Sequence, residues 1–106
     1  MQNYIVYKGD YGFTIPFAVV SSNGSAIDLT GYKPVLKVWG AGIPSILLFS
    51  GSTTLDSAST GLCHYTVSST NLTVVGTFMA ELELQNSTSG IVQTWDQFQL
   101  TIKESP

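Results

Sequence analysis

The chain has 106 residues, of which 43% are hydrophobic, and its formal net charge is −3. This length and apolar content suit a single domain, residues 1–106, with one core. Four lysines, no arginine and no basic stripe argue against nucleic-acid binding, which depends largely on neutralising phosphates. No apolar run approaches the ~20 residues of a membrane-spanning helix. The single cysteine, Cys63, rules out an internal disulfide, so packing or assembly must stabilise the fold.

The first third of the chain predicts three strands separated by turns. Asn3–Lys8 is rich in aromatic and β-branched residues, which favour strands. Phe13–Val20 alternates with a period of two, which predicts a strand with one buried face. Because Pro16 cannot donate a ladder hydrogen bond, this strand is expected at a sheet edge or unpaired at that point. Asn23-Gly24 is a strong turn signal, and a third alternating strand follows at Pro34–Trp39.

The middle of the chain combines an apolar run with a polar stretch. Ile43–Ser50 is nearly all apolar, which predicts a strand covered on both faces or a strand with one face in an interface. Gly51–Thr60 is polar, with small residues and one apolar step at Leu55. The strand that follows Gly61 alternates again, so that one face carries Cys63, Tyr65 and Val67 and the other Leu62, His64 and Thr66.

The last third predicts a long hairpin. Ser68–Val75 is expected to form either one helical turn or an irregular crossing loop. Thr77–Gln85 has the clearest alternation of the chain, and Asn86–Gly90 has the composition of a hairpin loop. Ile91–Lys103 then forms the final strand, with a bulge expected at Trp95-Asp96. The residues expected to face the core are Phe78, Ala80, Leu82, Leu84, Phe98, Leu100 and Ile102.

Seven or eight short strands, with turns at roughly regular intervals and no segment of helical period, predict an all-β fold. The expected architecture is an antiparallel β-sandwich of immunoglobulin-like size. It is Ig-like in layout only, because the two cysteines that bracket a core tryptophan in antibody domains are missing. A small β-barrel is the alternative.

The order of short motifs resembles the N-terminal β-sandwich domain of phage baseplate upper proteins and related Ig-like modules of tailed-phage particles. Each motif is a turn that leads into an alternating strand, and together they extend over most of the chain. The matching residues are Gly9-Asp10, Ser22-Asn23-Gly24, Asp28-Leu29-Thr30-Gly31 with Val35–Trp39, Ser59-Thr60-Gly61 with Cys63–Val67, and Gly76–Leu82.

The resemblance implies a non-enzymatic structural protein of a phage or prophage particle, which acts through protein–protein contacts. Such a protein would be a tail or baseplate adaptor, or a capsid-surface decoration module. Its expected partners are other virion proteins and a second copy of itself, with assembly in the host cytoplasm. In the family this domain usually opens a longer chain that carries a fibre or receptor-binding region. Because this sequence ends at Pro106, a role in receptor attachment is not expected.

The aromatic residues are the most suggestive candidates for binding. By alternation, Trp39 falls on the face opposite Leu36 and Val38. Trp95 falls opposite Phe98 in the same way. Outward aromatics can be protein–protein anchors, sugar-stacking platforms or simple covers of a sandwich edge. A carbohydrate-binding or adhesin module, with a glycan on Trp39 or Trp95, is therefore the alternative function. The candidate interface residues are Trp39, Ile46, Leu47, Leu48, Phe49 and Trp95.

The remaining constellations favour structural interpretations. Glu81 and Glu83 share an outward face with their Cα atoms about 7 Å apart, a spacing that suits a glycosidase acid pair or calcium ligands. A solvated strand face is the simpler interpretation. His64 and Cys63 are neighbours in a strand and point to opposite faces, which excludes a Cys–His catalytic pair. The sequence therefore predicts no catalytic residue, no metal site and no cofactor.

Overall fold

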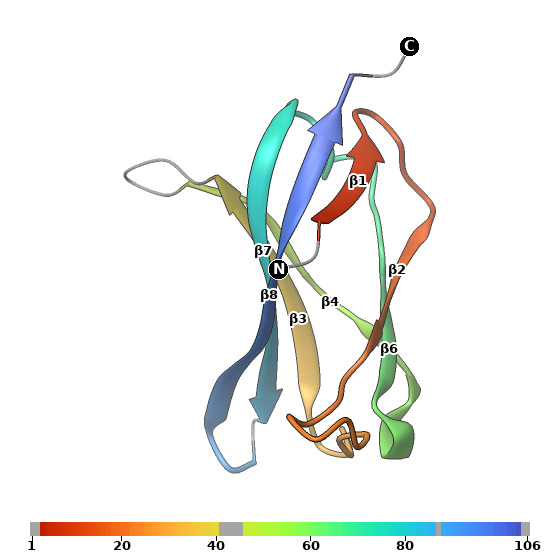
Figure 1. Cartoon of the computed structure of the whole chain (residues 1–106), viewed down its shortest axis with the longest axis vertical. Helices are drawn as coiled ribbons and strands as arrows, with labels where there is room; N and C mark the ends of the chain where they lie inside the picture. Colours follow the sequence, from red (N-terminus) through yellow and green to blue (C-terminus); the bar gives the residue numbers. More distant parts are fainter. Residues whose placement is uncertain (1–2, 41–45, 87, 105–106) are drawn as a thin grey trace.

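The computed structural model describes residues 3–40, 46–86 and 88–104 (Figure 1). Eight strands form in that part of the chain, and a single 3-10 turn, η1 (Ala58–Thr60), interrupts them. The strands are β1 (Asn3–Tyr7), β2 (Thr14–Ala18), β3 (Lys33–Gly40), β4 (Leu47–Ser52), β5 (Thr54–Ser57), β6 (Leu62–Thr66), β7 (Gly76–Asn86) and β8 (Ile91–Lys103). The prediction of an all-β fold with seven or eight strands is confirmed.

The strands form two sheets that face each other across the core (Figure 1). One sheet has five strands in the order β1-β8-β7-β3-β4, and the other has three in the order β2-β6-β5. The sandwich prediction is confirmed, and the barrel alternative is wrong because both sheets keep open edges. One pair departs from the antiparallel prediction, since β1 runs parallel to β8.

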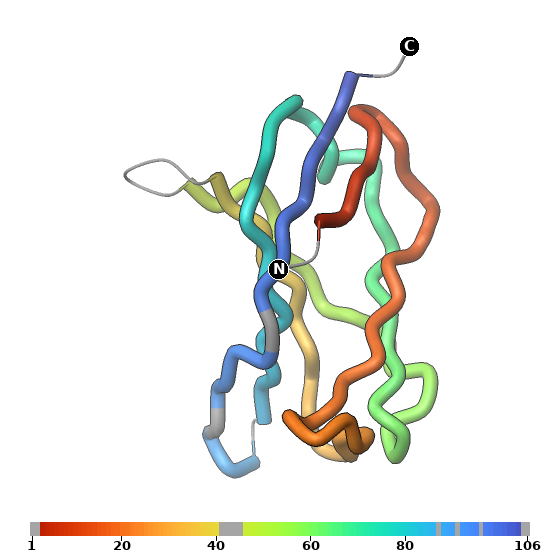
Figure 2. The backbone as a smooth tube through the Cα atoms, viewed as in Figure 1, coloured from red at the N-terminus to blue at the C-terminus, as the bar shows by residue number. Residues whose placement is uncertain are grey.

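The connections between strands gather at the two ends of the sandwich. In the backbone trace, the segments that join β2 to β3 and β5 to β6 lie at one end. The segments that join β1 to β2 and β6 to β7 lie at the other end (Figure 2). The crossing at residues 68–75 is irregular and contains no helix, with one turn in which Asn71 N–H donates to Ser68 O at 3.1 Å.

The period-two alternation places the core where the sequence predicts it. Most inward side chains of β2, β3, β6, β7 and β8 are buried, while Phe17 and Phe78 are partly buried against the core. The largest of those that are fully enclosed include Leu36, Leu82, Leu100 and Ile102. Gly51 on β4 allows the ring of Tyr65 to pack closely against that strand. A Cβ at that position would lie 2.7 Å from Cε1 of Tyr65, so only glycine lets this ring pack against the strand.

The segment that is polar in sequence, Gly51–Thr60, contains more strand than its composition indicates. It holds the end of β4, all of β5 and η1. β5 forms because its backbone pairs with β6, with Leu55 opposite Cys63, although its side chains do not alternate in polarity. The strand predicted at Ile43–Ser50 corresponds to β4, which begins at Leu47; residues 43–45 lie outside the described residues.

The predicted bulge in β8 is confirmed and has a consequence for Trp95. Leu82 pairs with Asp96 and Glu83 pairs with Thr94, which leaves Trp95 as the extra residue in the ladder. An extra residue changes the face on which the following side chains lie. The prediction that Trp95 faces outward, opposite Phe98, is therefore wrong: its ring packs at the edge of the core between the sheets.

Pro16 lies on β2, which is an edge strand as predicted.

Candidate interaction surface

The apolar run Ile46–Phe49, which enters β4 at Leu47, is partly exposed and partly buried. Ile46 is 73% exposed and Leu47 is 56% exposed. Leu48 is the extra residue at an irregularity in the β3–β4 ladder and packs partly against the core. Phe49 is buried, with its ring stacked on Tyr65 at a centroid distance of 5.9 Å. The placement of Phe49 in a surface interface is thus contradicted, because the core of the same chain covers it.

Trp39 lies beside the exposed part of this run. It is half-buried on the outer face of β3, and its register partners are Leu47 on β4 and Met79 on β7. The structure therefore brings Trp39, Ile46 and Leu47 to one corner of the five-stranded sheet, which we call the apolar corner. Trp95, on β8, is not part of it.

Trp95 lies on β8, toward the edge of the five-stranded sheet that is opposite β4, and there it links the two sheets. Its indole Nε1–H donates to the carbonyl oxygen of Val20 at 2.8 Å, and Val20 belongs to the segment that follows β2. The ring borders a shallow hollow whose other lining residues are Val20, Ser21, Ser22, Ile27 and Gln93. The hydrogen bond and the packing explain why this tryptophan is half-buried.

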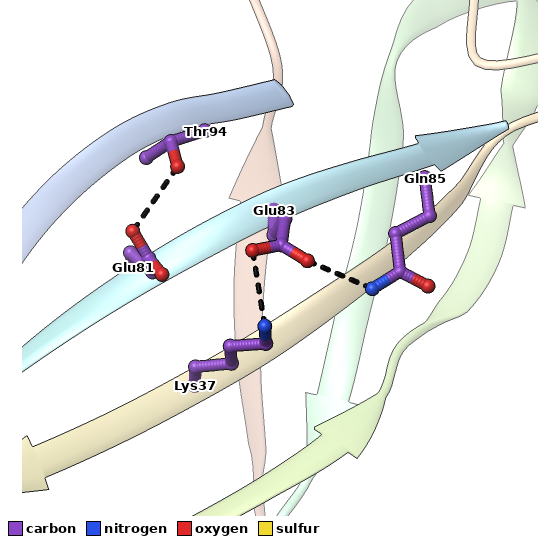
Figure 3. Close-up of polar contacts among 5 residues, drawn as sticks. All are labelled: Lys37, Glu81, Glu83, Gln85 and Thr94. Atoms are coloured by element: carbon purple, nitrogen blue, oxygen red, sulfur yellow. Dashed lines mark hydrogen bonds and ion pairs between the residues drawn. The ribbon is translucent and has the colours of Figure 1, made fainter. Parts of the chain in front are cut away.

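A polar cluster occupies the middle of the outer face of the five-stranded sheet (Figure 3). Lys37 Nζ donates to Glu83 Oε2 at 3.1 Å, and Gln85 Nε2 donates to Glu83 Oε1 at 2.8 Å. Thr94 Oγ1 donates to Glu81 Oε2 at 3.2 Å. The two carboxylates turn to separate partners and do not converge on a common point (Figure 3).

Glu83 departs from the predicted solvated face, since only 9% of it is exposed. The hydrogen bond from Gln85 lowers the pKa of Glu83, and the hydrogen bond and charge of Lys37 act in the same direction, while burial opposes them. The side chain is thus a satisfied, ionised acceptor that joins β3 to β7. Such a group stabilises the sheet and offers no free carboxylate for acid catalysis.

The histidine lies on the outer face of the three-stranded sheet. Its Nδ1 atom lies 2.8 Å from both carboxylate oxygens of Asp56. Cys63 lies on the buried face of the same strand, and burial raises the pKa of its thiol. The prediction that His64 and Cys63 diverge is confirmed. Within the described ranges, no group of three or more His, Cys, Asp or Glu residues could hold a metal ion.

The described helical content is limited to η1, and none of it is long and apolar enough to cross a membrane. Several exposed apolar residues are not among the candidates that the sequence indicates, including Val92, which is 64% exposed, and Val74, which is 51% exposed. Leu55, three residues after the end of β4, is another, at 38% exposed. Its signal in the sequence was its isolation as the one large apolar residue in a polar stretch.

Comparisons with known proteins agree with this geometry. Residues 2–106 match the sequence model of the family described as the BppU N-terminal domain. The fold is similar to the N-terminal domain of ORF48 of phage TP901-1, with a TM-score of 0.68 and 16% identity, over 97% of this chain and 84% of that chain. It is also similar to CopC from Methylosinus trichosporium OB3b, with a TM-score of 0.59 and 8% identity, over 100% and 88% of the two chains. At these identities the structural matches concern the fold alone. No curated protein sequence matches the chain.

Proposed function

The chain belongs to the BppU N-terminal domain family, and from that premise we propose that it is a baseplate adaptor of a phage or prophage particle. The family is one of structural domains of the phage baseplate upper protein, so the chain is a virion component and the resemblance noted in its sequence is confirmed. In the proposed role it joins other virion proteins through protein–protein contacts and carries out no reaction. The observation that carries this proposal is the family match over residues 2–106.

The surface supports an adaptor more than an enzyme. The apolar corner exposes Ile46 and Leu47 beside Trp39, and exposed apolar groups of this kind gain most when a partner covers them. The polar groups that would be needed for chemistry are engaged with neighbours, since Glu83 is held by Lys37 and Gln85. Decoration of the capsid surface is the competing location for the same kind of protein.

Purified particles provide the test. Virions made by the phage or induced prophage that encodes the chain would be separated into tails and heads, and each fraction analysed by quantitative mass spectrometry. A baseplate adaptor is expected in the tail fraction at a fixed ratio to the other tail proteins. Recovery with heads would support capsid decoration instead, and absence from both fractions would overturn the proposal.

A glycan-binding module is a second candidate, which the hollow beside Trp95 favours. The hollow is lined by an indole ring, which can serve as a stacking surface, and by the polar residues Ser21, Ser22 and Gln93. A glycan array probed with the folded protein tests this function. Binding that is lost in Gln93→Ala would support it, while a blank array would remove it.

A further inference from the structure

The open edges of the two sheets differ in how well they are protected against pairing with another strand. Natural edge strands are blunted by proline, charge, bulges or short length. β2 carries Pro16, and β5 is only four residues long and carries Asp56. β1 is five residues long and is followed by Lys8, while the bulge at Trp95 interrupts β8 beyond the reach of β1.

β4 lacks the strongest of these devices. It is six residues long, and the chain from Ile46 to Leu55 contains neither a charged residue nor a proline. The irregularity at Leu48 affects only its beginning, and from Phe49 to Ser52 the ladder with β3 is regular. No described strand pairs with the other side of β4.

The backbone groups on that open side can be assigned. Thr53 N–H donates to Pro34 O on β3 at 3.0 Å, so the backbone of Thr53 points toward β3. Alternate residues of an antiparallel strand direct their N–H and C=O groups to opposite sides. The groups of Ser50 and Ser52 therefore point away from β3, to the open edge, where their small side chains leave room for a further strand.

From this edge we infer that two copies of the chain associate by antiparallel pairing of their β4 strands about a two-fold axis. Antiparallel pairing places the beginning of one β4 beside the end of the other. Exposed apolar residues lie at both ends, with Ile46 and Leu47 where the strand begins and Leu55 three residues after it ends. The symmetric arrangement thus covers Ile46 and Leu47 of each copy with the Leu55 region of the other.

Charge also favours a second copy as the occupant of the edge. Self-pairing brings like residues together, which is unfavourable for a charged strand but costs nothing for an uncharged one. The nearest cation is Lys37, opposite Ser50 on β3, and it is paired with Glu83 at 3.1 Å. A six-residue strand pair covers less than the about 800 Å² per partner of a stable interface, so the dimer is weak and forms with rising concentration.

Sedimentation equilibrium across a series from about 10 μM to 1 mM, the range in which small interfaces associate, tests the inference. The wild-type mass is expected to rise from that of one chain toward that of two. Leu47→Lys and Ser50→Pro should each weaken the dimer at least about tenfold, which corresponds to about 1.4 kcal/mol. Val92→Lys, which adds the same charge at an exposed position on β8, is the matched control and should dimerise like the wild type.

Amide hydrogen exchange of the wild type gives a second measurement that needs no variant. The N–H groups of Ser50 and Ser52 should exchange more slowly as concentration rises, while exposed amides elsewhere keep their rates. A mass that stays at one chain, a trimer or larger ring, or a dimer unaffected by both β4 variants would overturn the inference. The dimer goes beyond the proposed adaptor role, and the two can fail separately. If the chain dimerises but is absent from particles, the β4 pairing stands and the adaptor role fails. If the chain is monomeric but present in the tail, the adaptor role stands and the pairing fails.

Discussion

Glu83 illustrates how the environment of one residue departs from what its position in a strand indicates. Alternation places it on the outer face of β7, where a carboxylate is usually hydrated. In the register between β3 and β7, Lys37 lies opposite Glu81. Glu83 is two residues further along β7 on the same face, and its carboxylate is within reach of Lys37. Gln85, two residues on, completes the pair of hydrogen bonds. The carboxylate is therefore ionised, enclosed and satisfied.

The lowered pKa of Glu83 predicts an acid-sensitive contribution to stability. Because the folded-state pKa lies below the ordinary value of 4.5, the contribution is fully present above about pH 4.5 and is lost as pH falls through the folded-state pKa. The free energy of unfolding should therefore fall more steeply between pH 5 and about pH 3 in the wild type than in Glu83→Gln. Urea unfolding at closely spaced pH values measures both curves, and parallel curves would contradict the prediction.

Gly61 is a second residue whose identity the backbone dictates. Its φ is +73°, and a Cβ there would lie 2.5 Å from Val19 O and 2.8 Å from Ile27 O. Gly61→Ala should lower the free energy of unfolding by about 3 kcal/mol or more, because strain and backbone clash act together. Gly12→Ala is the matched control: φ is +85° with nothing within 4 Å of the added Cβ, so only about 1 kcal/mol is expected. Equal losses in urea unfolding would show that the clash relaxes.

At the scale of elements, the bulge in β8 produces a contact between the five-stranded sheet and the segment that follows β2. The extra residue turns Trp95 toward the segment after β2, where its indole N–H reaches Val20 O. Without a bulge the same tryptophan would lie on the outer face, beyond reach of the other sheet. A local irregularity in one strand thus creates a contact between sheets.

Removal of this hydrogen bond should have a measurable cost. Trp95→Phe keeps a ring at the edge of the core but has no N–H donor, so we expect a loss of about 1 kcal/mol in the free energy of unfolding. The matched control is Trp39→Phe, since the indole of Trp39 has no hydrogen-bond partner among the described residues. Thermal and urea unfolding should separate the two variants. An equal effect of both substitutions would mean that ring size, and not the bond to Val20, determines the cost.

The same elements mark what the sequence could and could not predict. Alternation was sufficient for the faces of β2, β3 and β6, because side-chain period and burial coincide there. On β7 it placed Leu82 and Leu84 in the core but did not indicate that the outward Glu83 is also buried. It could not reveal β5, which exists through backbone pairing with β6. The apolar run at Ile46–Phe49 was recognised, but its division between the exposed Leu47 and the buried Phe49 depends on the irregular ladder with β3. To predict the face on which Trp95 lies, the bulge would have to be assigned to one particular residue of β8.

At the scale of the whole molecule, the first and last strands close the fold. β1 pairs in parallel with the end of β8, so that Val6 lies opposite Ile102. Joining these two strands encloses nearly the entire chain in one loop, and the entropic cost of closure grows with loop length. The β7–β8 hairpin, in contrast, joins strands that are neighbours in sequence. We therefore expect the hairpin to form early in folding and β1 to dock late.

Folding and unfolding rates in a denaturant series test this order. Val6→Ala removes a buried side chain from β1 and should cost about 2 kcal/mol, mainly as unfolding that is about tenfold faster. Leu82→Ala, a fully buried position in β7, should instead slow folding by about tenfold. Ile5→Ala, on the exposed side of β1, is the matched control and should change both rates less than about twofold. If Val6→Ala slows folding as strongly as Leu82→Ala, then β1 docks with the nucleus, and the pairing of the two ends of the chain is an early event.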